Sequence, residues 1–293
     1  MNSQQQKWYD KPISKIILVT IALTWMLPYF GFVFSSFRPG DSIKRTSWWN
    51  SIVTGDFIRE FTLENYTEIF ITDNLSRSFF NSLAVTIPST IIPITIAAFA
   101  AYAFAFIDFK GKDIAFLFVV AMMIVPLQMS LIPLIKLFSK GAVLFGITVI
   151  PELNINGTFV AVWFAHTGFG LPLATFLLRD FMMGLPKSVI ESAKIDGASV
   201  FATIRFVTIP LIRNISLVVI ILAVTNAFLL FDLVYAMTLG GPYHASEVLA
   251  TYMYYHGFSR GQISYGTAIA VLLFFIVVIV TAIQLLIARL LEK

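Results

Sequence analysis

The sequence predicts an all-α, polytopic membrane protein with six transmembrane helices and a cytoplasmic helical elbow. Hydrophobic residues make up 58% of the 293 residues and charged residues only 12%, whereas charged residues make up about 25% of soluble proteins. A soluble domain of this length cannot bury so much apolar surface, but a bilayer removes that need. Apolar runs of about 20 residues also recur, the length at which a helix crosses the hydrocarbon core.

Six apolar runs are assigned as transmembrane helices. They cover residues 14–37, 79–107, 114–137, 157–178, 212–237 and 264–288. The first run follows a basic N-terminus, but it is too long for a signal peptide and ends in no small-residue cleavage site, so we expect it to be retained.

The intervening segments complete the expected organisation. Residues 1–78 are predicted to hold the N-terminus, the first helix and the first extracytoplasmic loop, and residues 79–293 a core of five helices. Pro172 predicts a kink in the fourth helix, because proline removes a backbone hydrogen bond. The stretch 138–156 is too broken to span and is expected at the membrane interface.

The distribution of Lys and Arg predicts the orientation, since basic residues gather on cytoplasmic segments. The long first loop, 38–78, has five basic and six acidic residues. With the N-terminus inside, 12 of the 20 basic residues fall on cytoplasmic segments: Lys7, Lys11, Lys15, Lys110, Lys112, Arg179, Lys187, Lys194, Arg205, Arg213, Arg289 and Lys293. Both termini are therefore predicted to be cytoplasmic.

The first loop contains two further signals. Thr62 is a candidate N-cap for a helix that includes Glu64. Trp48 and Trp49 are of the type that collects at the membrane interface, which favours an interfacial amphipathic helix. A docking surface for an external partner is the alternative.

The segment 184–212, "GLPKSVIESAKIDGASVFATIRFVTIPLI", predicts a compact elbow on the cytoplasmic side. A helix is expected over 187–194. Asp196 and Gly197 should end it, because glycine readily adopts the left-handed conformation of a helix C-terminus. A second helix is expected from about Ser199 to Pro210. An ordinary cytoplasmic loop with a capped helix is the alternative.

The spacing within this segment resembles a known signature. Glu191, Ser192 and Ala193 are followed by Gly197 and then by Val207, Ile209 and Pro210. This pattern resembles that of permease subunits of binding-protein-dependent ABC importers, and "KIDGAS" (194–199) resembles their carbohydrate-uptake branch. The N-terminal half is similar to the six-span, maltose-transporter-type permease, whereas "TLGGP" (238–242) resembles the other permease of such pairs.

The resemblance implies a permease subunit that moves a sugar or sugar-like solute through the inner, cytoplasmic membrane of a bacterium or archaeon. Its implied partners are a second, related permease, two cytoplasmic ATPases and an extracytoplasmic solute-binding protein. ATP and Mg²⁺ would be bound by the ATPases, since this chain has no G-x-x-x-x-G-K-[ST] loop. No cofactor, metal site, catalytic residue or nucleic-acid partner is expected for this chain.

The resemblance also assigns roles within the coupling-helix elbow. Glu191 and Asp196 would offer carboxylates to an ATPase, and Gly197 would set the turn. Small residues would permit close packing. The full set of expected coupling residues is Glu191, Ser192, Ala193, Asp196, Gly197, Ala198 and Pro210.

Polar residues in the fifth predicted span indicate a substrate pathway. Thr225, Asp232 and Tyr235, with Phe228 between them, recur at helical spacing and are expected on one face. An acidic residue at membrane depth indicates a functional site. A structural role for Asp232, as a cap or a paired group, is the alternative. His166 is a further candidate, with a structural hydrogen-bonding role as its alternative.

Two other classes of membrane protein remain as rivals. A gradient-driven secondary transporter usually carries ionisable groups near the membrane midplane, and here only Asp232 and His166 qualify. The secondary-transporter interpretation also assigns no function to the elbow. An integral-membrane enzyme ranks last, because the sequence contains no H-E-x-x-H motif, no paired carboxylates within a span and no cysteine.

Overall fold

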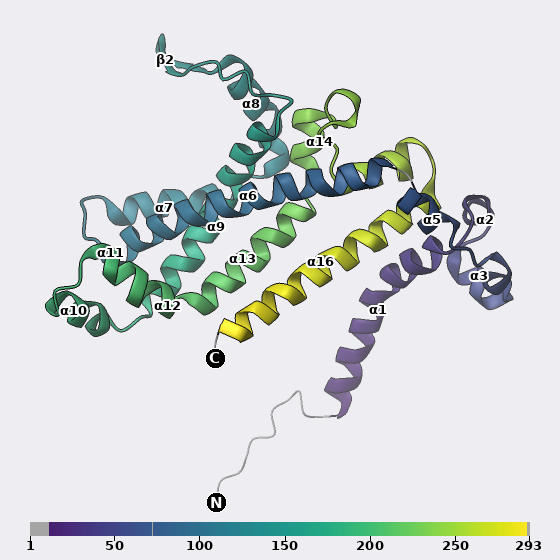
Figure 1. Ribbon diagram of the computed structural model, residues 1–293, viewed down its shortest axis with the longest axis horizontal. Helices are drawn as coiled ribbons and strands as arrows, with labels where there is room; N and C mark the ends of the chain where they lie inside the picture. The colour runs from purple at the N-terminus through teal and green to yellow at the C-terminus, as the bar shows by residue number, and fades with distance from the viewer. Residues whose placement is uncertain (1–11, 72, 292–293) are drawn as a thin grey trace, which may run out of the picture. The chain divides into compact units, whose positions relative to one another are not determined.

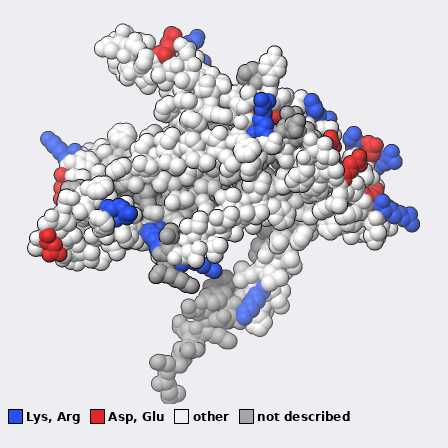
Figure 2. Space-filling view, viewed as in Figure 1, with Lys and Arg blue, Asp and Glu red and all other residues white. Residues whose placement is uncertain are grey.

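The computed structural model describes residues 12–71 and 73–291 and confirms the all-α, polytopic fold class. These described residues divide into two compact units, one that extends to residue 73 and includes 253–274, and the other made of 74–252 and of the residues from 275 on. Figure 2 shows charged side chains gathered over helix ends and connections rather than over the middles of the long helices. This distribution suits helices whose central surfaces face lipid.

Among the described residues, four helices are long and apolar enough to cross a membrane, and they match four of the predicted spans to within a few residues (Figure 1). They are α1 (Pro12–Ser36), α6 (Asp73–Phe106), α9 (Phe159–Met183) and α16 (Ile263–Leu291). Pro172 lies inside the continuous helix α9. Two bent helix pairs bring the possible number of spans to six.

The predicted third span, 114–137, is wrong as a single straight helix. It is divided into α7 (Lys112–Met122) and α8 (Leu127–Lys140), which meet at an angle of 104°. Pro126 precedes the first residue of α8 with extended backbone angles. Because proline lacks an N–H and disfavours a helical conformation of the residue before it, Pro126 ends the run at this point.

The predicted fifth span, 212–237, is also interrupted. Helix α13 (Arg213–Phe228) ends before Leu229, and the short helix α14 (Asp232–Thr238) begins after a break. Helix α13 has 16 residues and is therefore about 24 Å long, at a rise of 1.5 Å per residue. Asp232 lies in the first turn of α14, where a carboxylate interacts favourably with the helix dipole. The break places Thr225 and Asp232 on different helices.

A two-stranded hairpin follows α8, and the sequence did not predict it. Strands β1 (Ala142–Leu144) and β2 (Ile147–Ile150) are antiparallel. The two residues between them, Phe145 and Gly146, both have positive φ, of 50° and 78°, as expected for the tight turn that matches the strand twist. Its location at the membrane interface remains a prediction.

The core of the larger unit is built on a stripe of small residues. Ala97, Ala101 and Ala105 recur every fourth residue on α6 and are buried against α9 and α13. Small side chains at this spacing allow helix backbones to approach closely within a membrane. The indole N–H of Trp163 on α9 also donates to the carbonyl of Ala84 on α6 at 3.1 Å. These contacts fix the helices that line the cavity described below.

The rest of the larger unit comprises short elements. They are α10 (Lys187–Ile195), α11 (Val200–Thr203), the π-helical turn η2 (Ile204–Thr208), α12 (Ile209–Leu211) and the turn η3 (Pro242–His244). The chain crosses between the two units within α15 (Leu249–Tyr254), which is followed by the π-helical turn η4 (Tyr255–Ser259).

The loop of the smaller unit is organised around one fully buried arginine. The loop carries the short helices α2 (Gly40–Arg45), α3 (Trp48–Thr54), α4 (Asp56–Glu60) and α5 (Glu64–Ile71). The guanidinium of Arg38, 0% exposed, donates to Glu60 at 2.8 Å and to the Thr46 carbonyl at 3.0 Å. The side-chain amide of Asn65 donates to the carbonyls of Ser36 and Arg38. The network therefore ties α5 and α4 to the end of α1.

Two expectations for this loop can be compared with the structure. Helix α5 begins at Glu64, and the Leu63 carbonyl accepts from the N–H of Thr67, so the N-cap position falls on Leu63, one residue after the predicted Thr62. The Thr62 hydroxyl still accepts from the N–H of Glu64 at 3.1 Å. Trp48 stacks on Phe34 of α1 with ring centroids 6.1 Å apart. The position of Trp48 and Trp49 at the membrane interface remains a prediction.

The Glu60 carboxylate is expected to make this loop sensitive to acid. Burial raises its pKa, but hydrogen bonds from Arg38 and Ser51 and the Arg38 charge outweigh burial, so the pKa lies below its ordinary value of 4.5. A depressed carboxyl pKa stabilises the folded state above the unfolded-state value, and this stability is lost as pH falls through the folded-state pKa. The protection factors of amides in 38–66, which are exchange rates corrected for their intrinsic dependence on pH, should therefore be constant down to about pH 4.5 and lower below it. Glu60→Gln should remove this acid-dependent step, and an equal step in that variant would contradict the assignment.

Candidate functional site

The elbow forms as the sequence predicts, and its turn is a well-defined helix C-terminus. Helix α10 ends at Ile195, and the N–H of Ala198 donates to the carbonyl of Ala193 at 3.0 Å. Gly197 has a φ of +81°, in the left-handed region. This six-to-one hydrogen bond across a left-handed glycine is a Schellman motif. The predicted role of Gly197 in setting the turn is thus supported by the backbone geometry.

The second half of the elbow starts at a serine cap and ends at a proline. The N–H of Ala202 donates to the Ser199 hydroxyl at 3.2 Å, as for an N-cap. The π-helical turn η2 then precedes Pro210. In a regular α-helix the ring of Pro210 would clash with the carbonyl four residues earlier, and a widened turn relieves that clash. The segment Phe201–Leu211 meets α13 at an angle of 75°.

The elbow presents both apolar and acidic side chains. Ile195, Phe201 and Phe206 are 84%, 75% and 73% exposed. The carboxylates of Glu191 and Asp196 are exposed as well. Ser192 and Pro210 are exposed, and Ala193 and Ala198 are half-buried. Exposed aromatic residues beside charged ones are typical of a protein-binding surface.

A cavity of about 450 Å³ lies among α6, α8, α9, α13 and α14 in the larger unit. Small-molecule sites have volumes of about 300–1,000 Å³. Its wall is mainly apolar and includes Leu127, Phe169, Leu173, Leu177 and Leu222. Five polar side chains also line it: Ser89, Gln128, His166, Asn226 and Asp232. The cavity therefore combines an apolar wall with a few polar groups.

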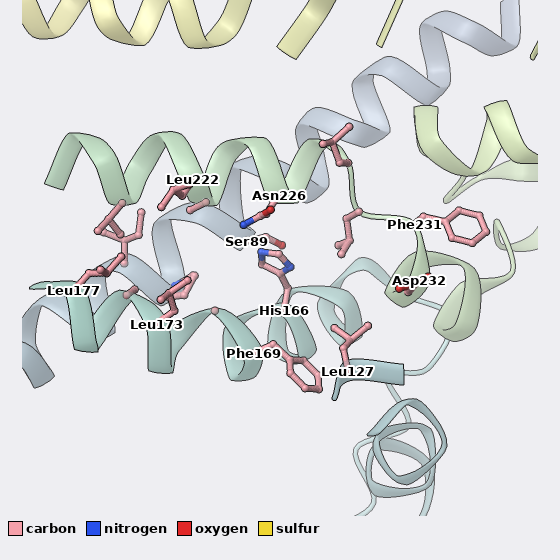
Figure 3. Close-up of a pocket in the computed structure, with 18 of the residues that line it drawn as sticks. Ser89, Leu127, His166, Phe169, Leu173, Leu177, Leu222, Asn226, Phe231 and Asp232 are labelled. Carbon is pink, nitrogen blue, oxygen red and sulfur yellow. The ribbon is translucent and has the colours of Figure 1, made fainter. Parts of the chain in front are cut away.

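Three of the polar groups lie close together in Figure 3. Ser89, His166 and Asn226 come from three different helices and point into the same part of the cavity, while Asp232 lies apart on α14. The side-chain amide of Gln128 on α8 donates to the Asp232 carboxylate at 3.1 Å. This hydrogen bond links α14 to the bent pair α7 and α8.

The hydroxyl of Ser89 is fully buried, and no partner for it is found among the described residues. A buried hydroxyl left without a hydrogen bond costs about 1–3 kcal/mol of stability.

Only one of the four predicted substrate-pathway residues lines the cavity. Asp232 does, but Thr225, Phe228 and Tyr235 are not among its lining residues. Phe228 is buried in the protein core at 3% exposure, and Tyr235 stacks on Phe231 with centroids 5.2 Å apart. The expectation of one shared helix face is wrong, because α13 ends at Phe228 and Asp232 and Tyr235 belong to a separate helix, α14.

His166, considered as a second candidate, does line the cavity, whereas Ser89, Gln128 and Asn226 were missed. Asn226 directly follows Thr225, and adjacent residues on a helix point about 100° apart. An amide within an apolar run was the available signal for Asn226. For Ser89 and Gln128, only the folded arrangement of distant helices reveals a role.

Comparison with known proteins identifies relatives of this chain. Residues 93–293 match the family described as "Binding-protein-dependent transport system inner membrane component". The osmoprotective compounds uptake permease protein GgtD of Synechocystis sp. is 39% identical over 210 residues, which are 72% of this chain and 66% of that protein. The alpha-glucoside transport system permease protein AglG of Rhizobium meliloti is 49% identical over 151 residues, 52% of this chain and 38% of that protein. The matches thus span less than two thirds of these relatives.

Solved structures share the fold. A chain of a bacterial ABC transporter involved in the import of the acidic polysaccharide alginate has a TM-score of 0.74, with 14% identity, over 99% of this chain and 100% of that chain. A second structure, of a bacterial alginate ABC transporter in complex with an alginate pentasaccharide-bound periplasmic protein, has a TM-score of 0.73 and 14% identity over 99% of both chains.

Proposed function

Since this chain belongs to the family of inner membrane components of binding-protein-dependent transport systems, we propose that it is the permease subunit of an ABC importer for a sugar or sugar-like solute. The observation that carries this proposal is the exposed elbow, with its left-handed Gly197 and its apolar and acidic surface. The sequence has no phosphate-binding loop of its own. Such a surface suits an energy-supplying partner and favours the importer over a gradient-driven transporter.

The elbow is proposed to dock on a cytoplasmic ATPase subunit. Exposed Ile195, Phe201 and Phe206 would enter an apolar groove, and the Glu191 and Asp196 carboxylates would accept hydrogen bonds from donors at its rim. Ala193, Ala198 and Ser192 would permit close approach, with Gly197 and Pro210 fixing the two ends of the elbow. ATP and Mg²⁺ would be held by two such ATPases and not by this chain.

The orientation and the other partners complete the proposal. The excess of Lys and Arg on the expected inside segments supports cytoplasmic termini and a cytoplasmic elbow. A second permease would form the pathway with this chain, and an extracytoplasmic solute-binding protein would deliver the solute. The similar transporter solved with its periplasmic protein supports this last expectation.

The sugar class is supported by the names of relatives and by the cavity. The relatives include permeases for osmoprotective compounds and for alpha-glucosides. The cavity places hydroxyl, imidazole and amide groups beside Phe169 and leucines. Sugars have both hydroxyl groups and apolar ring faces, so such a lining matches their chemistry.

The test is co-purification followed by transport. The tagged chain is expressed together with the other transport subunits of its host and purified from membranes. An ATPase subunit should co-purify with it. Proteoliposomes of that complex should take up solute only when ATP and the solute-binding protein are both supplied. Uptake by this chain alone, driven by an ion gradient without ATP, would reject the importer and support the secondary transporter.

Replacement of Asp232 by alanine is expected to lower uptake about tenfold, because it removes a cavity-lining carboxylate together with its hydrogen bond to Gln128. Membrane insertion and ATPase co-purification should be unchanged, since Asp232 lies outside the elbow. Glu152→Gln, which removes an exposed carboxylate outside the cavity, is the matched control. Wild-type uptake by Asp232→Ala would support a purely structural role for Asp232.

A further inference from the structure

Three polar residues of the cavity carry side chains that can both donate and accept hydrogen bonds. Ser89 on α6, His166 on α9 and Asn226 on α13 point into the same part of it (Figure 3). A hydroxyl, a neutral imidazole and a primary amide each both donate and accept hydrogen bonds. Such groups can pair with an alcohol of a solute in either hydrogen-bonding direction.

The buried Ser89 hydroxyl adds an independent indication of a ligand. Its residue is 0% exposed, and among the described residues nothing hydrogen-bonds to its oxygen. Buried polar groups in proteins are nearly always paired. A solute hydroxyl would supply the missing partner if the Ser89 side chain rotated toward the open cavity, because its oxygen is closed to a water-sized molecule in this structure.

The charged residues of the cavity wall favour neutral solutes over negatively charged ones. Asp232 is an acidic residue of the wall, and none of the lining residues in the described part of the chain is Lys or Arg. Sites that bind carboxylates or phosphates usually provide Arg or Lys. In this cavity a negatively charged solute would meet a carboxylate and, among the described lining residues, no Lys or Arg.

From this arrangement we infer that the cavity binds a neutral polyhydroxy solute through Ser89, His166 and Asn226, and that Asp232 discriminates against acidic sugars. This inference rests on the proposed importer function and narrows its substrate class. Phe169 and the leucines would pack against the apolar faces of the solute. Ser89, His166 and Asn226 would be binding residues, and Asp232 a specificity-determining residue.

The test measures solute binding to the purified complex of permeases and ATPases without the solute-binding protein, so that the specificity of that protein does not enter. The probes are radiolabelled neutral mono-, di- and trisaccharides and matched sugars in which one unit is a uronic acid. ATP-dependent uptake is measured in parallel with the solute-binding protein present. The variants are Ser89→Ala, Asn226→Leu and Asp232→Asn, with Glu152→Gln as the control for loss of a carboxylate elsewhere.

The expected result is that a neutral sugar binds and that its uronic-acid counterpart binds at least about tenfold more weakly. Ser89→Ala and Asn226→Leu should weaken neutral-sugar binding by about tenfold, the usual size of one lost hydrogen bond in a binding site. Asp232→Asn should raise the ratio of acidic to neutral sugar binding about tenfold, and Glu152→Gln should leave this ratio unchanged. If the complex with Asn226→Leu does not assemble, the nearly isosteric Asn226→Asp is used in its place. The Asn226→Asp variant should bind acidic sugars more weakly still.

Two outcomes would overturn the inference while leaving the importer intact. One is ATP-dependent uptake together with equal binding of neutral and acidic sugars. The other is neutral-sugar binding that Ser89→Ala and Asn226→Leu leave unchanged. Absence of ATP-dependent uptake of every probe would instead reject the proposed function, and this inference with it.

Discussion

Replacement of Gly197 by valine is expected to reduce solute uptake and ATPase co-purification by about tenfold or more. Gly197 has a φ of +81°, and a side chain there costs about 1–2 kcal/mol, more when it is β-branched. Apart from Gly197 and its two chain neighbours, no described atom lies within 4 Å of the position that its Cβ would take, so the effect comes from backbone strain and not from a clash. The strained turn would no longer hold α10 and α11 in the arrangement that presents Ile195 and Phe201.

Asparagine provides the control for this prediction. Asn adopts the left-handed conformation more readily than other non-glycine residues, so Gly197→Asn should keep most of the uptake and the co-purification. ATP-dependent uptake in proteoliposomes and ATPase recovery on the tagged chain are the two measurements. Equal activity of the valine and asparagine variants would show that the left-handed turn is not required for coupling.

Replacement of Arg38 by methionine is expected to destabilise the folded loop of the smaller unit by about 1.5–3 kcal/mol, the usual contribution of hydrogen bonds to a charged group, because the Glu60 carboxylate is 22% exposed and remains partly hydrated. Arg38 is 0% exposed and bonds to Glu60, Ser42 and both oxygens of Thr46. Its loss leaves Glu60 without its cationic partner. Thermal unfolding in detergent and proteolysis within 38–66 should both report the change.

The matched control is Arg45→Met, which removes an exposed arginine from α2 and should change stability by no more than about 0.5 kcal/mol. The double variant Arg38→Met with Glu60→Leu should recover part of the loss, because it removes the uncompensated carboxylate together with its partner. An Arg38→Met protein as stable as the Arg45→Met control would show that the ion pair does not hold the loop.

The sequence predicted those parts of the fold that depend on local composition. Apolar runs located four spans to within a few residues, and the Asp196-Gly197 pair located the turn of the elbow. Glycine and proline act on the backbone within a few residues, which is why such signals can be read along the chain. The spacing from Glu191 to Pro210 also led to the family that the comparison then matched.

The parts that were missed depend on contacts between distant segments. The break between Phe228 and Asp232 contains Leu229, Leu230 and Phe231 and has no glycine or proline to mark it. The cavity joins Ser89, His166 and Asn226, which are separated by 77 and 60 positions in the numbering. Likewise the pairing of Arg38 with Glu60 follows from the packing of the short loop helices and not from any local pattern.

The π-helical turn before Pro210 has a mechanical consequence. Pro210 cannot donate a backbone hydrogen bond, so this segment cannot form one regular helix through to α13, which it meets at an angle of 75°. Helix α13 follows the elbow and is about 24 Å long, so its far end lies about 24 Å from the elbow. If α13 rotated with the elbow as a rigid body, a rotation of roughly 10° would displace the far end of α13 by about 4 Å, which is close to the rise of one helical turn. That far end carries Asn226, so a small tilt at the elbow would shift one wall of the cavity.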